Sequence, residues 1–270
     1  MVGWLIAQPF AQPEPKPIPQ PTGGGDRNAI PFYKFPSAKV THHFVPQMPI
    51  RVSALRSLGA YMNVFAIESF MDELAAAANL DPVEFRLKHL DDPRAREVIE
   101  TVADRFDWKN WRKVGPYHGR GFAFAKYKNL AAYVAVALDL EVDRESGHIR
   151  LGRAVAADDS GQAVNPDGIK NQVEGATVQA ASWTLLEQVA FDRTRITSRD
   201  WATYPILRFE DVFRSVEVQI VDRPGQPYLG TGEGGQGPTA ATIGNAVAHA
   251  TGQRIRELPL TRERVKTAMG

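Results

Sequence analysis

The feature that most constrains this chain is a glycine-rich loop followed directly by an apolar segment. The loop spans residues 230–238 and places five glycines around a single carboxylate, Glu233. Glycine backbones enter conformations that other residues avoid. Residues 240–248 read as a buried helix, and Pro238 suits the first turn of such a helix. Loop amides and a helix N-terminus therefore converge near Glu233, a geometry that can hold an anion and position a base.

This loop has two other interpretations, of which the sequence argues against the second. Most glycine-rich loops before helices only turn the chain. Gly230, Gly232 and Gly235 also fit the G-x-G-x-x-G spacing of dinucleotide sites. That motif needs a strand leading straight into the glycines, whereas Pro224 and Pro227 interrupt the strand upstream. No clear second strand follows the helix either, so the sequence argues against a nicotinamide site.

Composition narrows the classes of function. The 270 residues suffice for one large domain or two small ones. A formal net charge of +1 gives no bias toward nucleic acid. The chain has no cysteine, which excludes disulfides, thiol catalysis and iron–sulfur ligation within it. We find no apolar run of about 18 residues and no export signal, so the default expectation is the cytoplasm, with periplasmic export through a partner as the alternative.

The first 30 residues are rich in proline and contain a run of three glycines. They predict an extended arm that lies over another surface, or a disordered tail, outside a domain at 31–270. Residues 30–44 alternate loosely and predict one or two short strands. His42 and His43 would then point to opposite faces of a strand, which argues against a shared metal ion.

Helices are predicted over residues 63–78, from residue 82 onward, and over 93–106. On the first of these, Glu68, Asp72 and Glu73 share a polar arc, which is more typical of a solvated face than of a catalytic carboxylate pair. Arg56 precedes this helix among small and apolar residues, which hints at partial burial. A surface arginine is the simpler interpretation, since a buried guanidinium needs partners or an anion.

After a subdivision near 112–118, the second half predicts strands at 130–142, 149–157 and 209–221. Helices are predicted at about 169–188 and after Pro238. Strands and helices do not alternate regularly, so the expected fold class is α+β, built from short mixed elements.

Several stretches, taken together and in order, resemble one family, the molybdenum hydroxylases of the xanthine dehydrogenase and aldehyde oxidase superfamily. Within it, the chain most resembles the isoquinoline 1-oxidoreductase and nicotinate dehydrogenase type of molybdopterin-binding subunit. Each motif alone is weak, whereas their common order is specific, and it covers about residues 28–265. The stretches are Leu55-Arg56-Ser57-Leu58-Gly59, Glu68-Ser69-Phe70-Met71-Asp72-Glu73-Leu74-Ala75, Asp81-Pro82-Val83-Glu84-Phe85-Arg86, Asp159-Ser160-Gly161 with Asn165-Pro166, Gln172-Val173-Glu174-Gly175, Gly232-Glu233, and Asn245-Ala246 with Leu258-Pro259.

The resemblance implies a role for individual residues. Glu233 matches the active-site glutamate, which acts as the general base. Arg56, with Ser57 beside it, matches a segment that contacts the molybdenum–pterin centre, and Gly232 and Gly234 flank the base in the cofactor-binding loop. Leu58 falls where some members place an aromatic residue over the substrate, so aromatic clamping of the substrate is in doubt here.

The resemblance also implies a reaction and its partners. The reaction is hydroxylation of an N-heterocycle or oxidation of an aldehyde, with water as the oxygen source. The cofactor is molybdenum–molybdopterin, in the cytosine dinucleotide form, shared with another chain. Electrons pass to iron–sulfur clusters carried on a partner subunit, and from there to a flavin or cytochrome acceptor.

The chain departs from the family at one motif. The Gly-Gln-Gly loop that embraces the pterin is absent, and Gln236-Gly237 does not replace it because that pair lies in the glutamate loop. We therefore expect the C-terminal part of an incomplete molybdopterin-binding domain, with a second polypeptide supplying the rest. The alternatives are a non-catalytic fragment or structural subunit that keeps the fold without the cofactor, and a generic binding module.

Overall fold

The computed structural model describes residues 24–43, 45, 48–50 and 55–270. Most of the predicted proline-rich arm at 1–30 therefore lies outside the described residues, and only residues 24–30 of it can be placed. Those residues lie against the folded domain and make hydrogen bonds with it.

A four-stranded mixed sheet forms the centre of the molecule, with strand order β1-β2-β3-β4. Its strands are β1 (His118–Lys126), β2 (Tyr133–Val142), β3 (Ile149–Asp159) and β4 (Ser215–Ile220). The first three strands are antiparallel neighbours, and β4 runs parallel to β3. The predicted strands at 130–142, 149–157 and 209–221 are confirmed with shifted ends, whereas β1 was not predicted.

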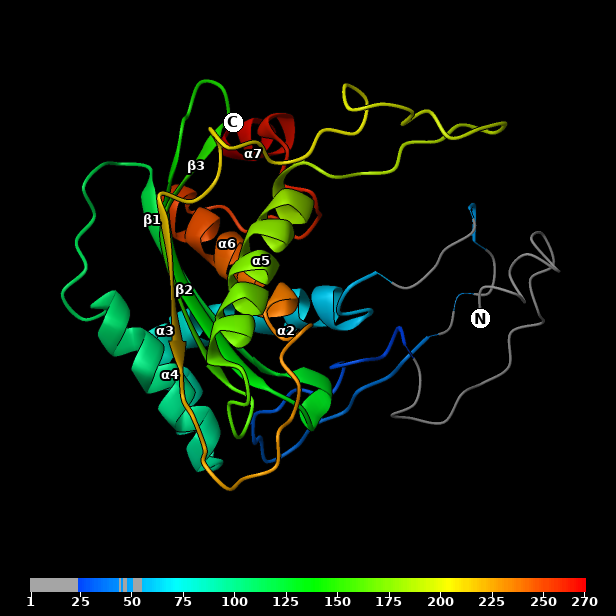
Figure 1. Ribbon diagram of the computed structural model, residues 1–270. Helices are drawn as coiled ribbons and strands as arrows, with labels where there is room; N and C mark the ends of the chain where they lie inside the picture. The colour runs from blue at the N-terminus through cyan, green and yellow to red at the C-terminus, as the bar shows by residue number, and fades with distance from the viewer. Residues whose placement is uncertain (1–23, 44, 46–47, 51–54) are drawn as a thin grey trace, which may run out of the picture.

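Helices cover both faces of this sheet (Figure 1). On one face, α3 (Pro82–Lys88) and α4 (Pro93–Phe106) pack into an apolar cluster with the sheet. On the other face lie α5 (Pro166–Leu185) and α6 (Gln236–Thr251), with α2 (Ala60–Ala77) packed against α6. The C-terminal helix α7 (Arg262–Met269) closes one end. This arrangement confirms the α+β class.

Helix α6 lies unusually close to β1, which explains a Gly-x-Gly pair in that strand. A Cβ atom on Gly119 would meet the Ala246 carbonyl oxygen at 2.2 Å, and one on Gly121 would meet the Thr242 carbonyl oxygen at 2.0 Å. Any larger residue would push the helix off the sheet. The two glycines therefore set the depth at which α6, and the loop before it, sits on the sheet.

The strands predicted within 30–44 are wrong for the described part of that segment. Residues 30–43 contain no strand, because the segment uses its aromatic side chains as anchors instead of pairing its backbone. Tyr33 inserts into the core cluster of α2, α3 and α4, while Phe32 and Phe35 pack at its border. His42 and His43 are both exposed.

The polar arc on α2 is not the solvated face that the sequence predicted. Glu68 is buried instead of solvated, since Arg86 of α3 reaches across and pairs with Glu68 Oε2 at 2.8 Å and Asp72 Oδ1 at 2.7 Å. Arg86 itself is 0% exposed. The arc is therefore largely a buried ionic contact between helices, and Glu73, 29% exposed at its side chain, is only partly solvated and pairs with Arg256 at 2.5 Å.

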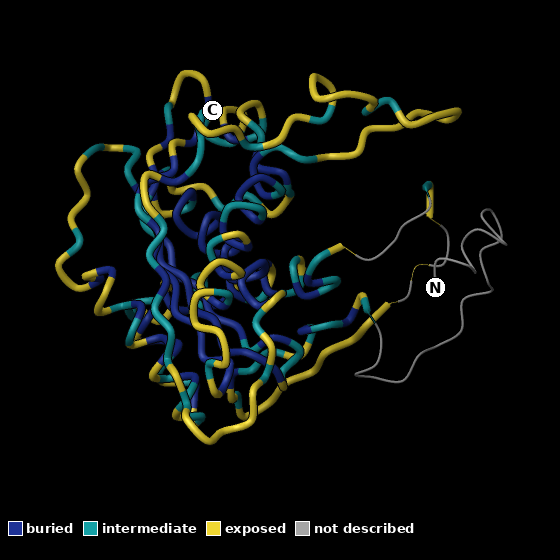
Figure 2. The backbone as a smooth tube through the Cα atoms, viewed as in Figure 1, coloured by how far each residue is buried: buried dark blue, intermediate teal, exposed yellow. Residues whose placement is uncertain are grey.

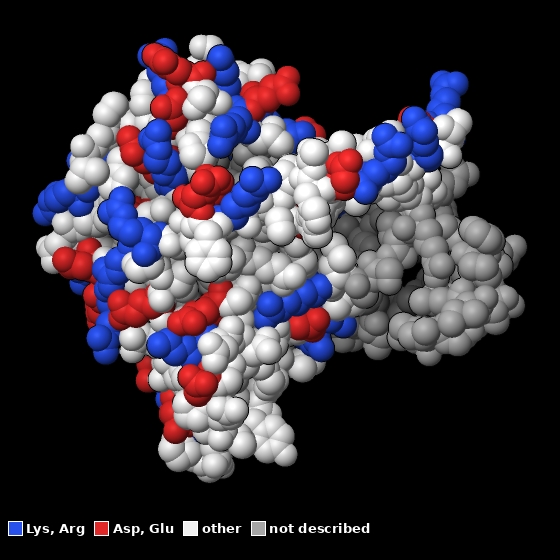
Figure 3. Space-filling model, turned by 45° about the horizontal axis from the view of Figure 1, so that its top comes forward, with Lys and Arg blue, Asp and Glu red and all other residues white. Residues whose placement is uncertain are grey.

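A long hairpin-like arm, residues 186–214, projects from the end of α5, and most of its residues are exposed, whereas Phe213 at its base is buried in the core (Figures 1 and 2). A bridge between Phe191 and Ile196 holds its tip together. Large apolar side chains on it face solvent, among them Trp201 at 70% and Phe209 at 98% exposure. Acidic and basic side chains intermix on the face seen in Figure 3, in keeping with the low net charge.

Candidate active site

Glu233 lies in the loop before α6, where three separate segments meet. Its Oε1 accepts a hydrogen bond from the Ser57 amide at 3.2 Å, and its Oε2 accepts one from the Tyr127 hydroxyl at 2.5 Å. Arg27 Nη1 lies 3.9 Å from Oε2. The Glu233 side chain stays 34% exposed. The carboxylate is thus held at both oxygens and still reaches the surface.

Arg56 ties the segment before α2 to the glutamate loop and to α5. Its Nε donates to the Gly232 carbonyl at 2.7 Å. Its Nη2 donates to the carbonyl and the side chain of Gln172, and its Nη1 donates to Gln179. Partial burial lowers the pKa of Arg56, and the neighbouring Glu233 opposes this shift. The hint of a partly buried, partnered arginine is thereby borne out.

Ser57 and Leu58 follow Arg56 in an unusual backbone conformation. Both have positive φ angles, 74° and 49°, which non-glycine residues adopt rarely and mostly at functional or strongly constrained positions. This turn aims the Ser57 amide at Glu233 while the Ser57 side chain is 1% exposed. Leu58 lies half-buried beside it. The structure therefore brings Arg56, Ser57 and Leu58 to the loop that carries Glu233.

The two glycines beside Glu233 differ in their surroundings. Around Gly232 there is room, since a Cβ atom there would approach only the Gln172 side chain, at 3.9 Å. At Gly234 a Cβ atom would meet Val134 of β2 at 2.8 Å. Gly232 thus lies in open space beside the base, whereas Gly234 packs the loop onto the sheet.

The charge state of Glu233 follows from these neighbours. Burial alone would raise its pKa, but the hydrogen bonds from Tyr127 and Ser57 and the charges of Lys128 and Arg27 outweigh that effect and lower it. Burial, together with the Glu233 contact, raises the pKa of Tyr127 to about 12. At neutral pH the phenol therefore stays protonated and donates to an ionised carboxylate.

Sequence reasoning missed several residues that build this site. Tyr127 comes from η1 (Tyr127–Asn129), directly after the unpredicted strand β1, and Arg27 comes from the segment taken as an arm. Gln172 had no assigned contact, and the structure pairs it with Arg56. A Cβ atom on Gly175 would meet nothing within 4 Å, whereas one on Gly235 would meet Ala176 of α5 at 2.9 Å.

Three buried polar atoms without partners in the described part of the chain lie in the turn before α2 and at the start of α6. Ser57 Oγ, Gln236 Oε1 and Thr239 Oγ1 are buried and have no hydrogen-bond partner among the described residues. Within that same part of the chain, no side chain caps the N-terminus of α6 at Gly235. Buried polar groups and helix amides are normally satisfied. These atoms, with the open space at Gly232, fit a large polar or anionic group.

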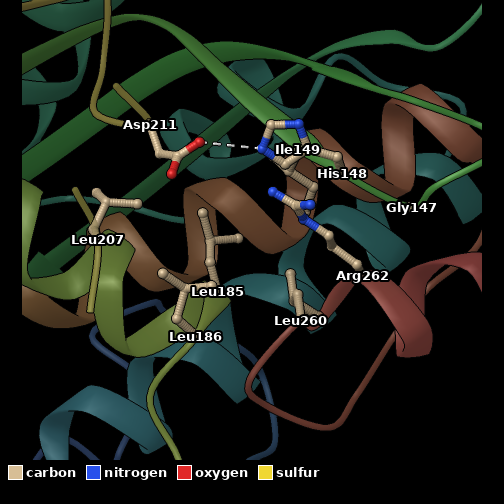
Figure 4. A pocket seen from close by; sticks show the side chains of 9 residues that line it. All are labelled: Gly147, His148, Ile149, Leu185, Leu186, Leu207, Asp211, Leu260 and Arg262. Atoms are coloured by element: carbon tan, nitrogen blue, oxygen red, sulfur yellow. Dashed lines mark ion pairs between the residues drawn. The ribbon is translucent and has the colours of Figure 1, made fainter. Parts of the chain in front are cut away.

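The described residues offer no cluster of three His, Asp or Glu side chains that could hold a metal ion. A separate small cavity of about 40 Å³ lies at the base of the exposed arm, where His148 Nε2 and Asp211 Oδ1 are 3.3 Å apart (Figure 4). Leucine side chains line much of it. Such a volume holds only one or a few water molecules, so this cavity is not the candidate site. None of the described helices is long and apolar enough to cross a membrane.

The fold is that of a cofactor-binding domain. The family model of the molybdopterin cofactor-binding domain matches residues 53–213, and this chain belongs to that family. The resemblance read from the ordered motifs is thereby confirmed.

Similar proteins support the same conclusion. The chain is 40% identical over 268 residues to one of the subunits of nicotinate dehydrogenase from Pseudomonas putida, covering 94% of this chain and 22% of that protein. It is 34% identical over 217 residues to the beta subunit of isoquinoline 1-oxidoreductase from Brevundimonas diminuta, covering 80% and 27% respectively. The chain thus spans about a quarter of the length of these relatives.

Solved structures share the fold at low sequence identity. Quinoline 2-oxidoreductase from Pseudomonas putida 86 superposes with a TM-score of 0.70 at 14% identity, covering 79% of this chain and 52% of that one. Aldehyde oxidoreductase from Desulfovibrio gigas gives a TM-score of 0.69 at 16% identity, covering 80% and 41%. These matches agree with the mixed sheet and its helical layers.

Proposed function

We propose that this chain forms one side of the active site of a molybdenum-dependent oxidoreductase. The reaction is hydroxylation of an N-heterocycle or oxidation of an aldehyde, with water as the oxygen source and Glu233 as the general base. The observation that carries the proposal is the meeting of Glu233 with the Ser57 amide and Arg56, which lie some 176 residues away in the sequence. The names of the two relatives support an N-heterocyclic substrate.

The residues present fit a molybdopterin cofactor. We assign its binding to Arg56, Ser57, Gly232 and Gly234. Two observations favour this assignment. Ser57 Oγ is buried and has no hydrogen-bond partner among the described residues, and there is open space beside Gly232. A bound cofactor would supply the missing partner and fill that space. Gly234 would act through the shape of the loop, since its own position packs on β2. The cytosine dinucleotide form of the cofactor is part of the proposal.

Within this chain, Glu233 is the group that accepts the proton. Its lowered pKa keeps it ionised at neutral pH, and the contacts at both oxygens fix its orientation. Leu58 would line the substrate side as an aliphatic wall. When bound, the molybdenum cofactor supplies the two-electron oxidation of the substrate carbon. Covering the exposed part of Glu233 would raise its pKa toward the range that suits a general base.

The proposal includes partners. A further polypeptide segment supplies the remainder of the molybdopterin-binding domain, and an iron–sulfur subunit accepts the electrons and passes them to a flavin or cytochrome. The exposed apolar side chains of the 186–214 arm support a contact with such a segment, because patches of this kind mark interaction sites. The arm begins at the C-terminal end of α5, the helix whose Gln172 and Gln179 contact Arg56.

Replacing the base tests the proposal. In the assembled enzyme, Glu233→Gln should lower turnover by about a hundred- to ten-thousand-fold, the usual range for loss of a general base. Folding and molybdenum content should stay as in the wild type, because glutamine keeps the size and polarity of the side chain. Steady-state turnover with an electron-acceptor dye measures the effect.

The matched control is Glu257→Gln, which changes an exposed glutamate paired with Arg264. It should leave turnover unchanged. Wild-type turnover in Glu233→Gln would overturn the assignment of Glu233 as the base.

A further inference from the structure

The segment formed by residues 24–30 fastens itself to the start of α2. The Gly24 carbonyl accepts a hydrogen bond from the Gly59 amide at 2.9 Å. Asn63 Nδ2 donates to the carbonyls of Gly25 and Arg27, each at 2.9 Å. One side of the segment is therefore fixed next to the turn that presents Ser57 to Glu233.

The other side of the same segment fastens to η1. Asn28 Nδ2 donates to the Lys126 carbonyl at 2.8 Å, and Asn28 Oδ1 accepts from the Lys128 amide at 2.8 Å. Asn129 Nδ2 donates to the Ile30 carbonyl at 2.9 Å. Lys128 and Asn129 both have a φ of 59°, a conformation that needs support from its surroundings. The segment thus holds the strained turn that carries Tyr127.

Between these two anchors, Arg27 joins the candidate site. Its Nη1 donates to the Tyr127 hydroxyl at 2.7 Å, and its guanidinium lies over the Tyr127 ring, 5.6 Å from the ring centre. Tyr127 in turn donates to Glu233 Oε2 at 2.5 Å. Because Tyr127 is only 5% exposed, its ring has little room to turn away. A continuous hydrogen-bonded chain therefore runs from Arg27 through Tyr127 to Glu233.

We propose that Arg27 is a positioning residue that acts through Tyr127 to hold the Glu233 carboxylate with Oε1 turned to the Ser57 amide. This inference rests on the proposed function, in which Glu233 is the base. Arg27 takes up one acceptor site of the phenol oxygen, so the phenol hydrogen is directed to Glu233. The 24–30 segment is thereby part of the active-site architecture and not a linker.

The groups around Glu233 shift its pKa, so a titration of Glu233 can test the arrangement. Tyr127, Lys128 and Arg27 approach it from η1 and the 24–30 segment, and Arg56 approaches from the turn before α2. The tyrosine and the cations favour the ionised carboxylate, against the opposing effect of burial, and the pKa of Glu233 is lowered. Loss of the tyrosine hydroxyl or of the arginine should raise that pKa.

The experiment is a carbon-13 NMR titration of glutamate side-chain carboxyls in the purified chain, with the Glu233 signal assigned from its loss in Glu233→Gln. In Tyr127→Phe the midpoint of the Glu233 titration should move upward by about one pH unit, because a charge-assisted hydrogen bond is lost. Arg27→Gln should move it in the same direction by less. The shift in the double variant should be smaller than the sum of the two single shifts, because part of the Arg27 effect passes through the phenol and the rest comes from its own charge 3.9 Å from Glu233 Oε2.

Two controls separate a local effect from a general one. Tyr204→Phe removes a hydroxyl that donates to Glu187 at 2.8 Å in the exposed arm, and Arg256→Gln breaks the pair with Glu73. Both should leave the Glu233 midpoint unchanged. Arg27→Lys serves if Arg27→Gln disturbs folding, and it should also raise the midpoint, because lysine lacks the planar guanidinium.

An unchanged midpoint in folded Tyr127→Phe would overturn the inference, and so would shifts that add in the double variant. The titration needs neither cofactor nor turnover. A failure of the titration therefore differs from a failure of the proposed function, which would leave the midpoint shifts intact while Glu233→Gln kept full activity.

Discussion

Asp158, at the end of β3, anchors the loop that carries Glu233. Its Oδ2 accepts a hydrogen bond from the Thr231 hydroxyl at 2.7 Å, two residues before Glu233. The residue is 0% exposed, and Oδ1 has no partner within the described part of the chain. Burial raises the pKa of Asp158 to about 6, although the hydrogen bond from Thr231 opposes the shift. The protonated form of this carboxyl is therefore favoured by the folded state.

The raised pKa has a definite sign for stability. Asp158 stabilises the fold fully below its unfolded pKa near 4, and this contribution is lost as the pH rises through about 6. In Asp158→Asn that loss is absent, because asparagine does not ionise. The free energy of unfolding of the variant, relative to the wild type, should therefore increase by about 2–3 kcal/mol between pH 4 and pH 7. Urea denaturation at several pH values measures this difference, and a difference independent of pH would contradict the pKa shift.

At the scale of residues, the sequence singled out Glu233 and its loop but did not predict the groups that hold the Glu233 carboxylate. Glu233 is evident from the glycines around it, which are local in sequence. Arg27 and Tyr127 reach it from positions 206 and 106 residues away, respectively, and nothing in their neighbourhoods marks a function. Their role depends on the packing of η1 against the 24–30 segment, and a chain read in order does not show that packing.

At the scale of elements, α2 and α3 are joined by a buried charge cluster. Arg86 pairs with Glu68 and Asp72. Glu68 also accepts hydrogen bonds from the Tyr33 hydroxyl at 2.7 Å and the Phe124 amide at 2.8 Å. The cluster links two helices, the 30–43 segment and β1, so each of its groups is satisfied only when all four elements are in place.

Breaking that cluster should be costly. Arg86→Met removes the cation and leaves the Glu68 and Asp72 carboxylates buried, so the free energy of unfolding should fall by about 3–5 kcal/mol. The control, Arg150→Met, breaks an exposed pair with Glu141 in which both side chains are more than half exposed, and it should change stability by less than about 1 kcal/mol. Urea denaturation of both variants at neutral pH provides the comparison. If the free energy of unfolding fell equally in the two variants, the buried cluster would contribute no more to stability than an exposed ion pair.

The elements that could be predicted are those whose pattern is local. Helix α4 and strand β2 follow from apolar periodicity, and α3 begins at Pro82 with Asp81 accepting from the Val83 and Glu84 amides. Strand β1 was missed because its Gly-x-Gly start reads as a turn, although those glycines serve the approach of α6. The polar arc of α2 was misjudged because its partner, Arg86, lies on another helix.

At the scale of the whole molecule, the core is covered by helices, whereas the Glu233 site and the 186–214 arm lie at the surface. The sheet is covered on both faces (Figure 1), yet Glu233 remains partly exposed and the 186–214 arm projects freely. The relatives are about four times longer than the region that this chain matches. We expect the proposed partner segment to cover the site and the arm together, which would exclude water from Glu233.

The central claim is that this chain holds part of a molybdenum cofactor site, and metal analysis tests it most directly. The chain would be tagged in its native host, isolated with whatever it binds, and analysed for molybdenum by mass spectrometry. We predict about one molybdenum per chain, retained in Glu233→Gln and diminished in Arg56→Ala, which breaks the ties between the loop, the turn and α5. A folded complex that contains no molybdenum in the wild type would contradict the claim.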